Sequence, residues 1–281
     1  MAGASLFFKC ENFQKTGAFK FRGATNAVEL LAEPEHGVAT HSSGNHGAAL
    51  AAAAKARGIP AHIVVPKNAT AVKLAAVEHY GGQMVLCEPT LEARETTLER
   101  VVKETGAVFV PPFDHPHIIA GQGTVALELI EEVDGLDAVI APVGGGGLVS
   151  GTGITVKELR PNAEVFASEP EQADDAARSF RSGQIEPANS NTIADGLLTS
   201  LGPLTFQAIR ETVMDVITVS EAEIAAALRM VWERMKIVIE PSSAVPVAAI
   251  LKDERFKGKR VGIILTGGNV DLDSLEQLFR S

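Results

Sequence analysis

AVIAPVGGGGL, residues 138–148, joins a short and wholly apolar run to four consecutive glycines. The apolar run is typical of a strand buried on both faces, as in a parallel sheet covered by helices. Four glycines in a row cost conformational entropy that a turn does not require, and they allow N–H groups to converge on an anion. With a helix beginning near Leu148, the segment predicts a phosphate-binding loop. The spacing of its glycines matches neither the Walker A motif nor GxGxxG, so a nucleotide is not specifically indicated. A flexible turn is the alternative.

Strands and helices alternate on both sides of this segment. Apolar runs predict strands at 6–10, 61–66, 83–87, 138–143, 164–167 and 261–265. Helical spacing predicts helices at 48–57, 71–79, 92–104, 124–132 and 222–235, with a long loop at 183–191. Such alternation requires right-handed crossovers and is typical of an α/β fold with an open, mostly parallel sheet.

The composition excludes several classes of protein. The chain has 281 residues, and its 35 acidic against 25 basic side chains disfavour nucleic acid as a partner, because phosphate contacts need clustered Lys and Arg. No apolar run approaches the ~20 residues that span a bilayer, and no signal-peptide pattern opens the chain. Cys10 and Cys87 are too few for a disulfide framework and fit a reducing cytoplasm. We therefore expect a cytoplasmic protein that acts on a small molecule, without a membrane or nucleic acid as partner.

Three further polar segments lie where ligands bind in α/β sheets, beyond the ends of strands. HSSGNHG at 41–47 leads into a helix; its donors suit a carboxylate, although a plain helix cap fits equally well. FQKTGAFKFRGA at 13–24 holds Lys20 between two phenylalanines. An amine in a partly apolar pocket has a lowered pKa, which favours addition to a carbonyl, whereas a surface lysine with a buried stem is the alternative. TGGN at 266–269, taken alone, is a turn.

Together these segments resemble the fold-type-II pyridoxal-phosphate (PLP) enzymes, which share the tryptophan synthase β fold. The resemblance covers nearly the whole chain and is closest to the serine racemases within the serine/threonine dehydratase family. The matching motifs are FQKTGAFKFRGA, HSSGNHG, IAGQGT (119–124), PVGGGGL (142–148), SEP..ADD (168–175), IADG (193–196), WERMK (232–236) and LTGGNVD (265–271). The resemblance implies two open, mostly parallel sheets covered by helices: a large PLP-binding domain, 1–36 with 115–281, and a small substrate-closing domain, 37–114. It also implies a homodimer.

The resemblance assigns the PLP contacts. Lys20 is the lysine that carries PLP covalently, Asn45 lies beside the ring hydroxyl and Thr266 beside the ring nitrogen. The phosphate cradle comprises Gly144, Gly145, Gly146, Gly147 and Leu148. A neutral hydroxyl at Thr266 does not force protonation of the ring nitrogen, so we expect a weaker electron sink than an Asp partner would give.

The resemblance also assigns the groups that act on the substrate. Racemisation needs acid/base groups on both faces of the α-carbon, and these are Lys20 on one face and Ser43 on the other. A serine hydroxyl has a poor intrinsic pKa for a base and relies on its surroundings; a helix cap is the alternative for Ser43. The substrate-binding set is Ser42, Ser43, Asn45 and His46, with Arg94 as a substrate-responsive arginine or, alternatively, a solvated helix charge.

The activity implied is that of a serine racemase, which interconverts L- and D-serine and also eliminates water from serine to give pyruvate and ammonia. The alternative is an L-threonine/L-serine dehydratase or a 3-hydroxyaspartate dehydratase with little racemase activity, because no motif here determines the pocket volume. A PLP- or nucleotide-binding sensor without turnover would not need the complete set of motifs.

A cation and a nucleotide also follow from the resemblance. Glu169, Asp175 and the carbonyl of Ala173 match a divalent-cation site, and hard oxygen ligands suit Mg²⁺ or Ca²⁺; carboxylates that cap a helix are the alternative. Animal serine racemases bind ATP as an activator at a dimer interface, and the matching positions are Lys15, Thr16, Tyr80, Lys236, Glu240 and Asn269. Ala48 stands where those enzymes have a glutamine that contacts the nucleotide. We also expect the family's N-terminal helix and strand to be missing ahead of the strand at 6–10.

Overall fold

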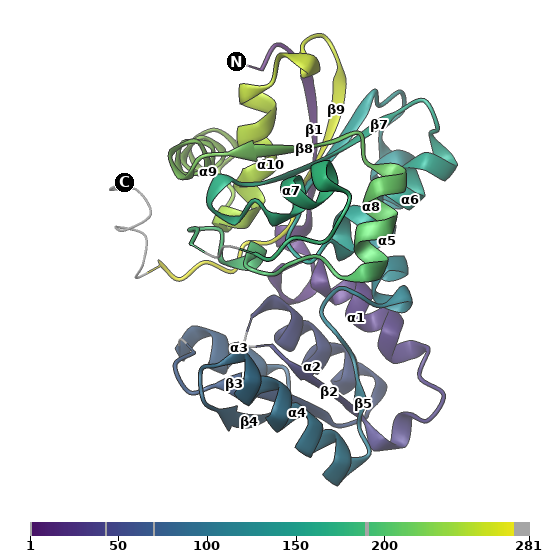
Figure 1. Ribbon diagram of the computed structural model, residues 1–281, viewed down its shortest axis with the longest axis vertical. Helices are drawn as coiled ribbons and strands as arrows, with labels where there is room; N and C mark the ends of the chain where they lie inside the picture. Colours follow the sequence, from purple (N-terminus) through teal and green to yellow (C-terminus); the bar gives the residue numbers. More distant parts are fainter. Residues whose placement is uncertain (1, 43, 70, 189–190, 273–281) are drawn as a thin grey trace. The chain divides into compact units, whose positions relative to one another are not determined.

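The computed structural model describes residues 2–42, 44–69, 71–188 and 191–272, and it divides into two compact units (Figure 1). The larger unit comprises residues 1–19 and 122–281, and the smaller one comprises residues 20–121. These units differ in extent from the domains expected from the sequence, because the helix that begins at Lys20 packs on the helix that begins at Asn45. The expected boundaries, with a small domain at 37–114 inserted into a large domain of 1–36 and 115–281, stay a prediction.

The larger unit has a parallel sheet in the order β1-β9-β6-β7-β8. Its strands are β1 (Ser5–Cys10), β6 (Ala138–Pro142), β7 (Glu164–Pro170), β8 (Asp215–Val219) and β9 (Arg260–Leu265). Its helices are most of α5 (Pro116–Glu132), α6 (Gly147–Leu159), α7 (Asp175–Ser182), α8 (Pro203–Thr212), α9 (Glu221–Met235) and α10 (Pro241–Lys252). Successive strand residues point to opposite faces. Ile140 therefore packs in the cluster with α9 and α10, whereas Val139 packs with α5, α6, α7 and α8.

The smaller unit repeats this arrangement around a parallel sheet in the order β4-β3-β2-β5. Its strands are β2 (Val38–His41), β3 (Ala61–Pro66), β4 (Gln83–Cys87) and β5 (Val108–Phe109). Its helices are α1 (Lys20–Glu29), α2 (Asn45–Arg57), α3 (Ala71–His79) and α4 (Leu91–Thr105). Ile63 packs with α1, α2 and α3 on one face, and its neighbour Val64 packs with α4 on the other. Burial on both faces explains why β3 is almost continuously apolar in the sequence.

The strands and helices predicted from the sequence are all present. The helix predicted at 124–132 begins at Pro116, eight residues earlier, and the other ends shift by at most three residues. Residues 183–188 of the expected loop lie outside helices and strands, and 189–190 lie outside the described residues. Sequence patterns missed β2, β5, β8, α1, α7, α8 and α10. β2 and β5 are too short to show a period, and Pro246 inside α10 interrupts a helical pattern.

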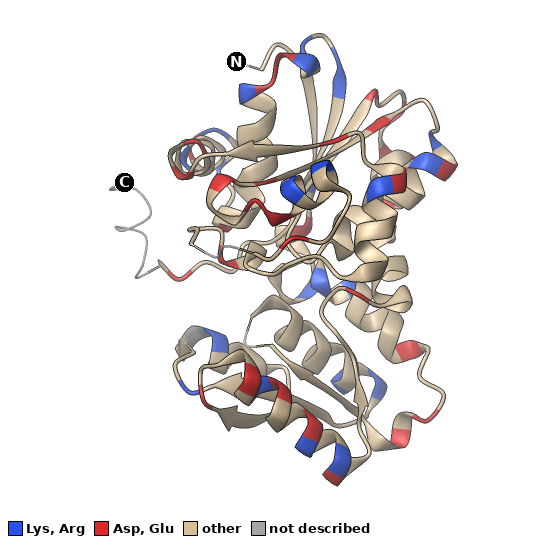
Figure 2. Cartoon of the chain, in the orientation of Figure 1, with Lys and Arg blue, Asp and Glu red and all other residues tan. Residues whose placement is uncertain are grey.

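The outer helix faces carry both signs of charge (Figure 2). On α4 the Arg100 guanidinium lies 3.0 Å from the Glu104 carboxylate, and on α9 Arg229 lies 3.8 Å from Glu233. Such pairs, four residues apart, stabilise exposed helix faces modestly. Within the part of the chain that the structure describes, no helix combines the length and apolar character needed to cross a membrane.

Candidate active site

The four glycines connect β6 to α6 in a closely packed loop of the larger unit. Gly146, with a φ of +87°, directly precedes the first turn of α6, and no side chain caps that turn. A Cβ on Gly146 would lie 2.8 Å from Thr205 Cβ, and one on Gly144 would lie 3.0 Å from Leu197 Cα. Glycine is therefore required at both positions for packing. The first N–H groups of α6 and the positive end of its dipole suit a phosphate group.

Lys20 begins α1 immediately after a segment that is bonded to the end of β9. Ala18 pairs with Gly267 in an antiparallel bridge, and the Phe19 N–H donates to the Thr266 carbonyl at 2.9 Å. Lys20 itself is half-buried, and its Nζ donates to the Pro112 carbonyl at 2.8 Å. The amine is thus held by the backbone rather than extended into solvent, which disfavours the interpretation as a surface lysine.

Thr266, nearly fully buried, follows β9 and has a hydroxyl partner that the sequence analysis missed. Its Oγ1 lies 2.9 Å from the Oγ of Ser243, in the first turn of α10. Ser243 Oγ also donates to the Gly267 carbonyl at 2.7 Å and accepts the Gly267 N–H at 2.8 Å. The only sequence signal was PSS at 241–243, which also fits an ordinary helix start.

The HSSGNHG segment connects β2 to α2 in the smaller unit. Gly47 lies so close to Ser42 that a Cβ would meet the Ser42 carbonyl oxygen at 2.0 Å. Ser42 and Asn45 are half-buried, with Asn45 as the first residue of α2, whereas Ser43 lies outside the described residues. The loop therefore curls tightly over the α2 N-terminus, where backbone donors suit a carboxylate.

His46 connects this loop to the rest of the smaller unit. It is buried, and its Nε2 lies 3.0 Å from the Val110 carbonyl. Burial, aided by the positive charge of Lys20, lowers the pKa of His46 to about 3. The ring is therefore neutral near pH 7, with Nε2 as the donor to Val110. The influence of Lys20 also indicates that the amine and the loop lie near each other within this unit.

The His46 pKa predicts a loss of stability in acid. The unfolded chain binds a proton near the ordinary pKa of about 6.5, and the folded chain binds it only near 3, so the free energy of unfolding falls as pH falls through this window. At pH 5 the expected loss is about 2 kcal/mol. Urea unfolding at pH 5 and 7.5 measures it. The difference between the two pH values should shrink in His46→Gln but not in His79→Gln, an exposed histidine of the same unit; equal differences in both would contradict this assignment.

Arg94 lies on α4 with part of its guanidinium buried. Its Nε is buried and has no hydrogen-bond partner among the described residues. Burial lowers the pKa of His41, and the positive charge of Arg94 lowers it further, so the guanidinium lies near the end of β2. A buried, unpaired donor beside the HSSGNHG segment argues against a fully solvated charge and suits a carboxylate.

The predicted cation ligands meet at the carboxyl end of β7. Glu169 accepts the N–H groups of Ala177 at 2.5 Å and Ala176 at 3.2 Å, so it does cap α7, as the alternative proposed. Ala173 is buried in the short turn before α7. Asp175 Oδ2 is buried without a partner among the described residues. Burial and nearby negative charge raise the pKa of Glu169 to about 9, and burial raises that of Asp175 to about 6.

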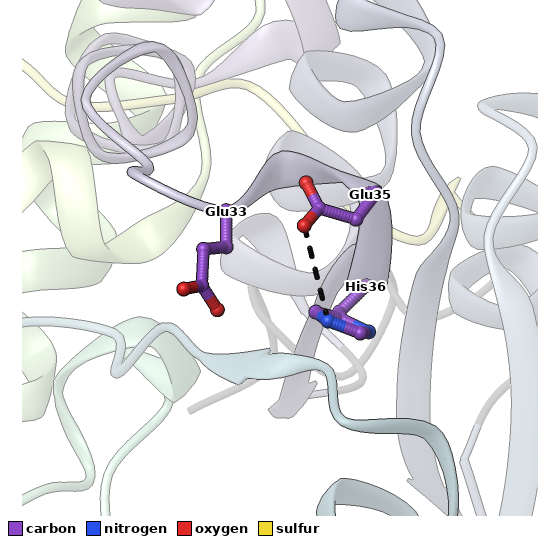
Figure 3. A group of neighbouring side chains, drawn as sticks. All are labelled: Glu33, Glu35 and His36. Carbon is purple, nitrogen blue, oxygen red and sulfur yellow. Dashed lines mark ion pairs between the residues drawn. The ribbon is translucent and has the colours of Figure 1, made fainter.

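A different acidic group lies on the surface of the smaller unit, at Glu33, Glu35 and His36 (Figure 3). Their ligand atoms lie within 4.8 Å of one another, and all three side chains are exposed. His36 Nε2 is 3.9 Å from Glu35 Oε1. Exposed acidic groups of this kind are ordinary surface features, and we assign no metal to them.

Comparison with known proteins identifies the family. The family model described as pyridoxal-phosphate dependent enzyme matches residues 1–267. The chain belongs to this family. It is 55% identical to the β-hydroxyaspartate dehydratase of Paracoccus denitrificans, over 98% of this chain and 89% of that protein. It is also 55% identical to the serine racemase of Dictyostelium discoideum, over 99% and 88%. The structure of maize serine racemase is similar, with a TM-score of 0.95 and 48% identity over 98% of this chain and 87% of that one. The family and fold class expected from the sequence are confirmed.

The residues of this PLP-dependent enzyme fit the coenzyme within each unit. The larger unit supplies the glycine loop at the start of α6, where a Cβ on Gly144 or Gly146 would meet Leu197 or Thr205. It also supplies the Thr266 hydroxyl, whose only hydrogen bond among the described residues is to Ser243. The smaller unit supplies the Lys20 amine. A phosphate cradle, a hydroxyl and an amine are the donor set that PLP requires.

Two of the positions predicted for ATP lie together within the larger unit of this PLP-dependent enzyme. Asn269 Nδ2 donates to the Thr16 carbonyl at 2.7 Å, next to the exposed Lys15. Lys236 ends α9 with a φ of +60°, and Glu240 is buried before α10. Tyr80, packed edge-on to His79, belongs to the smaller unit.

Proposed function

We propose that this enzyme interconverts L- and D-serine and also eliminates water from serine to give pyruvate and ammonia. The observation that carries the proposal is the position of the Lys20 amine. It is half-buried, it donates a hydrogen bond to the Pro112 carbonyl, and it lies close enough to the HSSGNHG segment for its positive charge to lower the pKa of His46. The identity with a named serine racemase over nearly the whole chain supports it.

PLP, when bound, supplies an electron-withdrawing ring that makes the α-proton of an attached amino acid acidic. Gly144 to Leu148 hold the phosphate, with Asn45 at the ring hydroxyl and Thr266 at the ring nitrogen. The N–H groups at the start of α2, from Ser42 to His46, bind the substrate carboxylate. Lys20 takes or returns the α-proton on one face, and the Ser43 hydroxyl does so on the other.

Incubation with L-serine, D-serine, L-threonine and 3-hydroxyaspartate tests this function. Chiral chromatography measures racemisation, and keto-acid detection measures elimination. We expect both enantiomers of serine to interconvert and both to yield pyruvate. Binding of PLP without turnover of any of the four substrates would overturn the proposal.

A second candidate is a 3-hydroxyaspartate dehydratase, and the buried Nε of Arg94, which has no hydrogen-bond partner among the described residues, favours it. A substrate with a second carboxylate would pair with this guanidinium, and a relative with 55% identity carries the name β-hydroxyaspartate dehydratase.

Substitution of Arg94 distinguishes the two substrates. Arg94→Gln is expected to lower kcat/KM for 3-hydroxyaspartate by about tenfold or more, because a charged hydrogen bond is lost, and to affect serine much less. Arg100→Gln, an exposed arginine on the same helix, is the matched control. Equal losses for serine and 3-hydroxyaspartate would assign Arg94 a role common to both.

We further propose that Glu169, Asp175 and the Ala173 carbonyl bind Mg²⁺ or Ca²⁺. The raised pKa values of the two carboxyl groups support it, as does Asp175 Oδ2, which has no hydrogen-bond partner in the described part of the chain, because a cation would compensate buried negative charge. An ATP site at the six positions above and a homodimer are proposed on the resemblance alone. A cytoplasmic location is proposed from the cysteine content, Cys10 and Cys87.

The cation is expected to stabilise the fold. At one hundred times its Kd, it should add about 2.7 kcal/mol to the free energy of unfolding and raise the Tm. Thermal unfolding with Mg²⁺, with Ca²⁺ and with a chelator measures the effect. Asp175→Asn should remove the response, and Glu171→Gln, an exposed neighbour, should keep it. A response that persists in Asp175→Asn would place the cation elsewhere.

A further inference from the structure

Val110 lies just after β5 and is held through both of its backbone polar groups. Its N–H donates to the Ala39 carbonyl of β2 at 2.9 Å, and its carbonyl accepts a hydrogen bond from His46 Nε2 at 3.0 Å. The Val110 side chain is buried in the core cluster that also contains residues of α1, α2 and α3. Val110 therefore has a fixed place in the smaller unit, and the His46 side chain supplies one of the two hydrogen bonds that fix it.

Two prolines follow Val110 and extend this rigidity along the chain. The pyrrolidine ring fixes the φ angles of Pro111 and Pro112 at about −65°. A residue that precedes a proline is restricted to extended conformations, and this applies to Val110 and to Pro111. Few freely rotating bonds are thus left between the anchored Val110 and the carbonyl of Pro112.

The Pro112 carbonyl is the point at which this segment contacts Lys20. It accepts a hydrogen bond from Lys20 Nζ at 2.8 Å, although the two residues are 92 positions apart in the chain. A neutral amine has two N–H bonds and one lone pair on the same nitrogen, so an acceptor that holds one N–H restricts the direction of the lone pair. A base must direct its lone pair at the proton that it takes, and a misplacement of about 1 Å can lower the rate about 10²-fold.

We propose that His46 is a positioning residue for Lys20. Through Val110 and the two prolines, it holds the Pro112 carbonyl as the acceptor of the Lys20 amine whenever that amine is not bonded to the coenzyme. This inference rests on the proposed function, in which Lys20 exchanges the α-proton on one face of the substrate. His46 also belongs to the segment proposed to bind the substrate carboxylate, so the carboxylate site and the support of the base form one rigid piece.

The neutral state of the His46 ring suits this role. Burial and the positive charge of Lys20 keep the pKa of His46 low, so the ring donates to Val110 without a charge of its own. A charged ring would repel the ammonium form of Lys20.

Acetylation of the full chain, freed of PLP by hydroxylamine and dialysis, tests the support of the amine without turnover. Only the neutral amine reacts, and a carbonyl acceptor stabilises the ammonium form. His46→Leu should therefore raise the rate of Lys20 acetylation by acetic anhydride about fivefold, measured by peptide mass spectrometry relative to the exposed Lys103. His46→Gln, whose amide can still donate to Val110, should keep the wild-type rate. His62→Leu, at a half-buried histidine of β3, is the matched control and should also keep it.

Kinetic isotope effects of the holoenzyme test positioning in the reaction itself. With L-serine deuterated at the α-carbon, His46→Leu should lower kcat for pyruvate release about tenfold and raise the isotope effect, because removal of the α-proton by a misplaced Lys20 becomes the slow step. With α-deuterated D-serine, whose proton is taken on the other face, the isotope effect should keep its wild-type value. His46→Gln should restore the wild-type values for L-serine.

A change in the segment itself provides a second variant. Pro111→Gly keeps the His46 side chain but releases φ in the middle of the segment, and it preserves the test should His46→Leu not fold. It should raise the acetylation rate of Lys20 and the L-serine isotope effect. Pro116→Gly, at an exposed proline that begins α5, should raise neither.

An unchanged acetylation rate in both His46→Leu and Pro111→Gly would overturn the proposal. An equal increase in His62→Leu, or an isotope effect that rises equally for the two enantiomers, would overturn it as well. A wild-type holoenzyme that turns over neither enantiomer would instead overturn the proposed function, and the acetylation rates would still test whether His46 supports the amine.

Discussion

Lys20→Ala is expected to abolish the visible absorption of lysine-bound PLP together with racemisation and elimination. In the proposed function the amine has two roles, as the covalent attachment point of the coenzyme and as the base on one face of the substrate. Loss of a positioned base alone costs about 10²–10⁴-fold in rate. Absorption spectra of the purified protein and the serine assays described above measure both losses.

The fold should survive this substitution. Lys20 is half-buried and contributes a hydrogen bond to the Pro112 carbonyl, so the free energy of unfolding should change by about 1 kcal/mol. Lys103→Ala, an exposed lysine of the same unit, serves as the control and should keep spectrum and activity. Turnover retained by Lys20→Ala, or lost equally by Lys103→Ala, would contradict the assignment of the amine.

The fold was predictable where burial on both faces makes a strand continuously apolar, as in β3 and β6. β8, with the sequence DVITV, was missed because Asp215 and Thr218 interrupt the apolar run. α1 was missed for another reason. Its sequence, KFRGATNAVE, contains Gly23 and several residues of low helix propensity, and only the packing of Ala24, Ala27 and Val28 against the smaller unit's core stabilises it as a helix.

The candidate site was predictable where one short motif carries the chemistry. Glycines after a strand, or a lysine between phenylalanines, are visible without knowledge of the packing. Ser243 could not be predicted in this way, because its partner Thr266 is 23 residues away and belongs to a different element. The buried Nε of Arg94 likewise depends on how α4 packs against the sheet, which no local pattern records.

The proposal that Lys20 and Ser43 exchange the α-proton on opposite faces of the substrate predicts different effects of a Ser43 substitution on the two enantiomers of serine. Ser43 itself lies outside the described residues. Lys20 and Ser43 act on opposite faces of the α-carbon, so each enantiomer of serine loses its α-proton to a different group. Ser43→Ala should therefore impair racemisation in both directions and elimination from D-serine, by about 10²-fold or more, because one positioned acid/base group is lost. Elimination from L-serine, which begins at Lys20, should fall only a few-fold by the same reasoning.

The enantiomers provide an internal control, since in the proposed function both bind at the same α2 N-terminus and are attached to the same coenzyme. Pyruvate release from each enantiomer and chiral analysis of the remaining serine give the three rates. Equal losses for L- and D-serine would mean that Ser43 supports binding or the loop conformation, as a helix cap does, and the second base would have to be sought elsewhere. A loss confined to D-serine and racemisation would assign the proton on that face to the Ser43 hydroxyl.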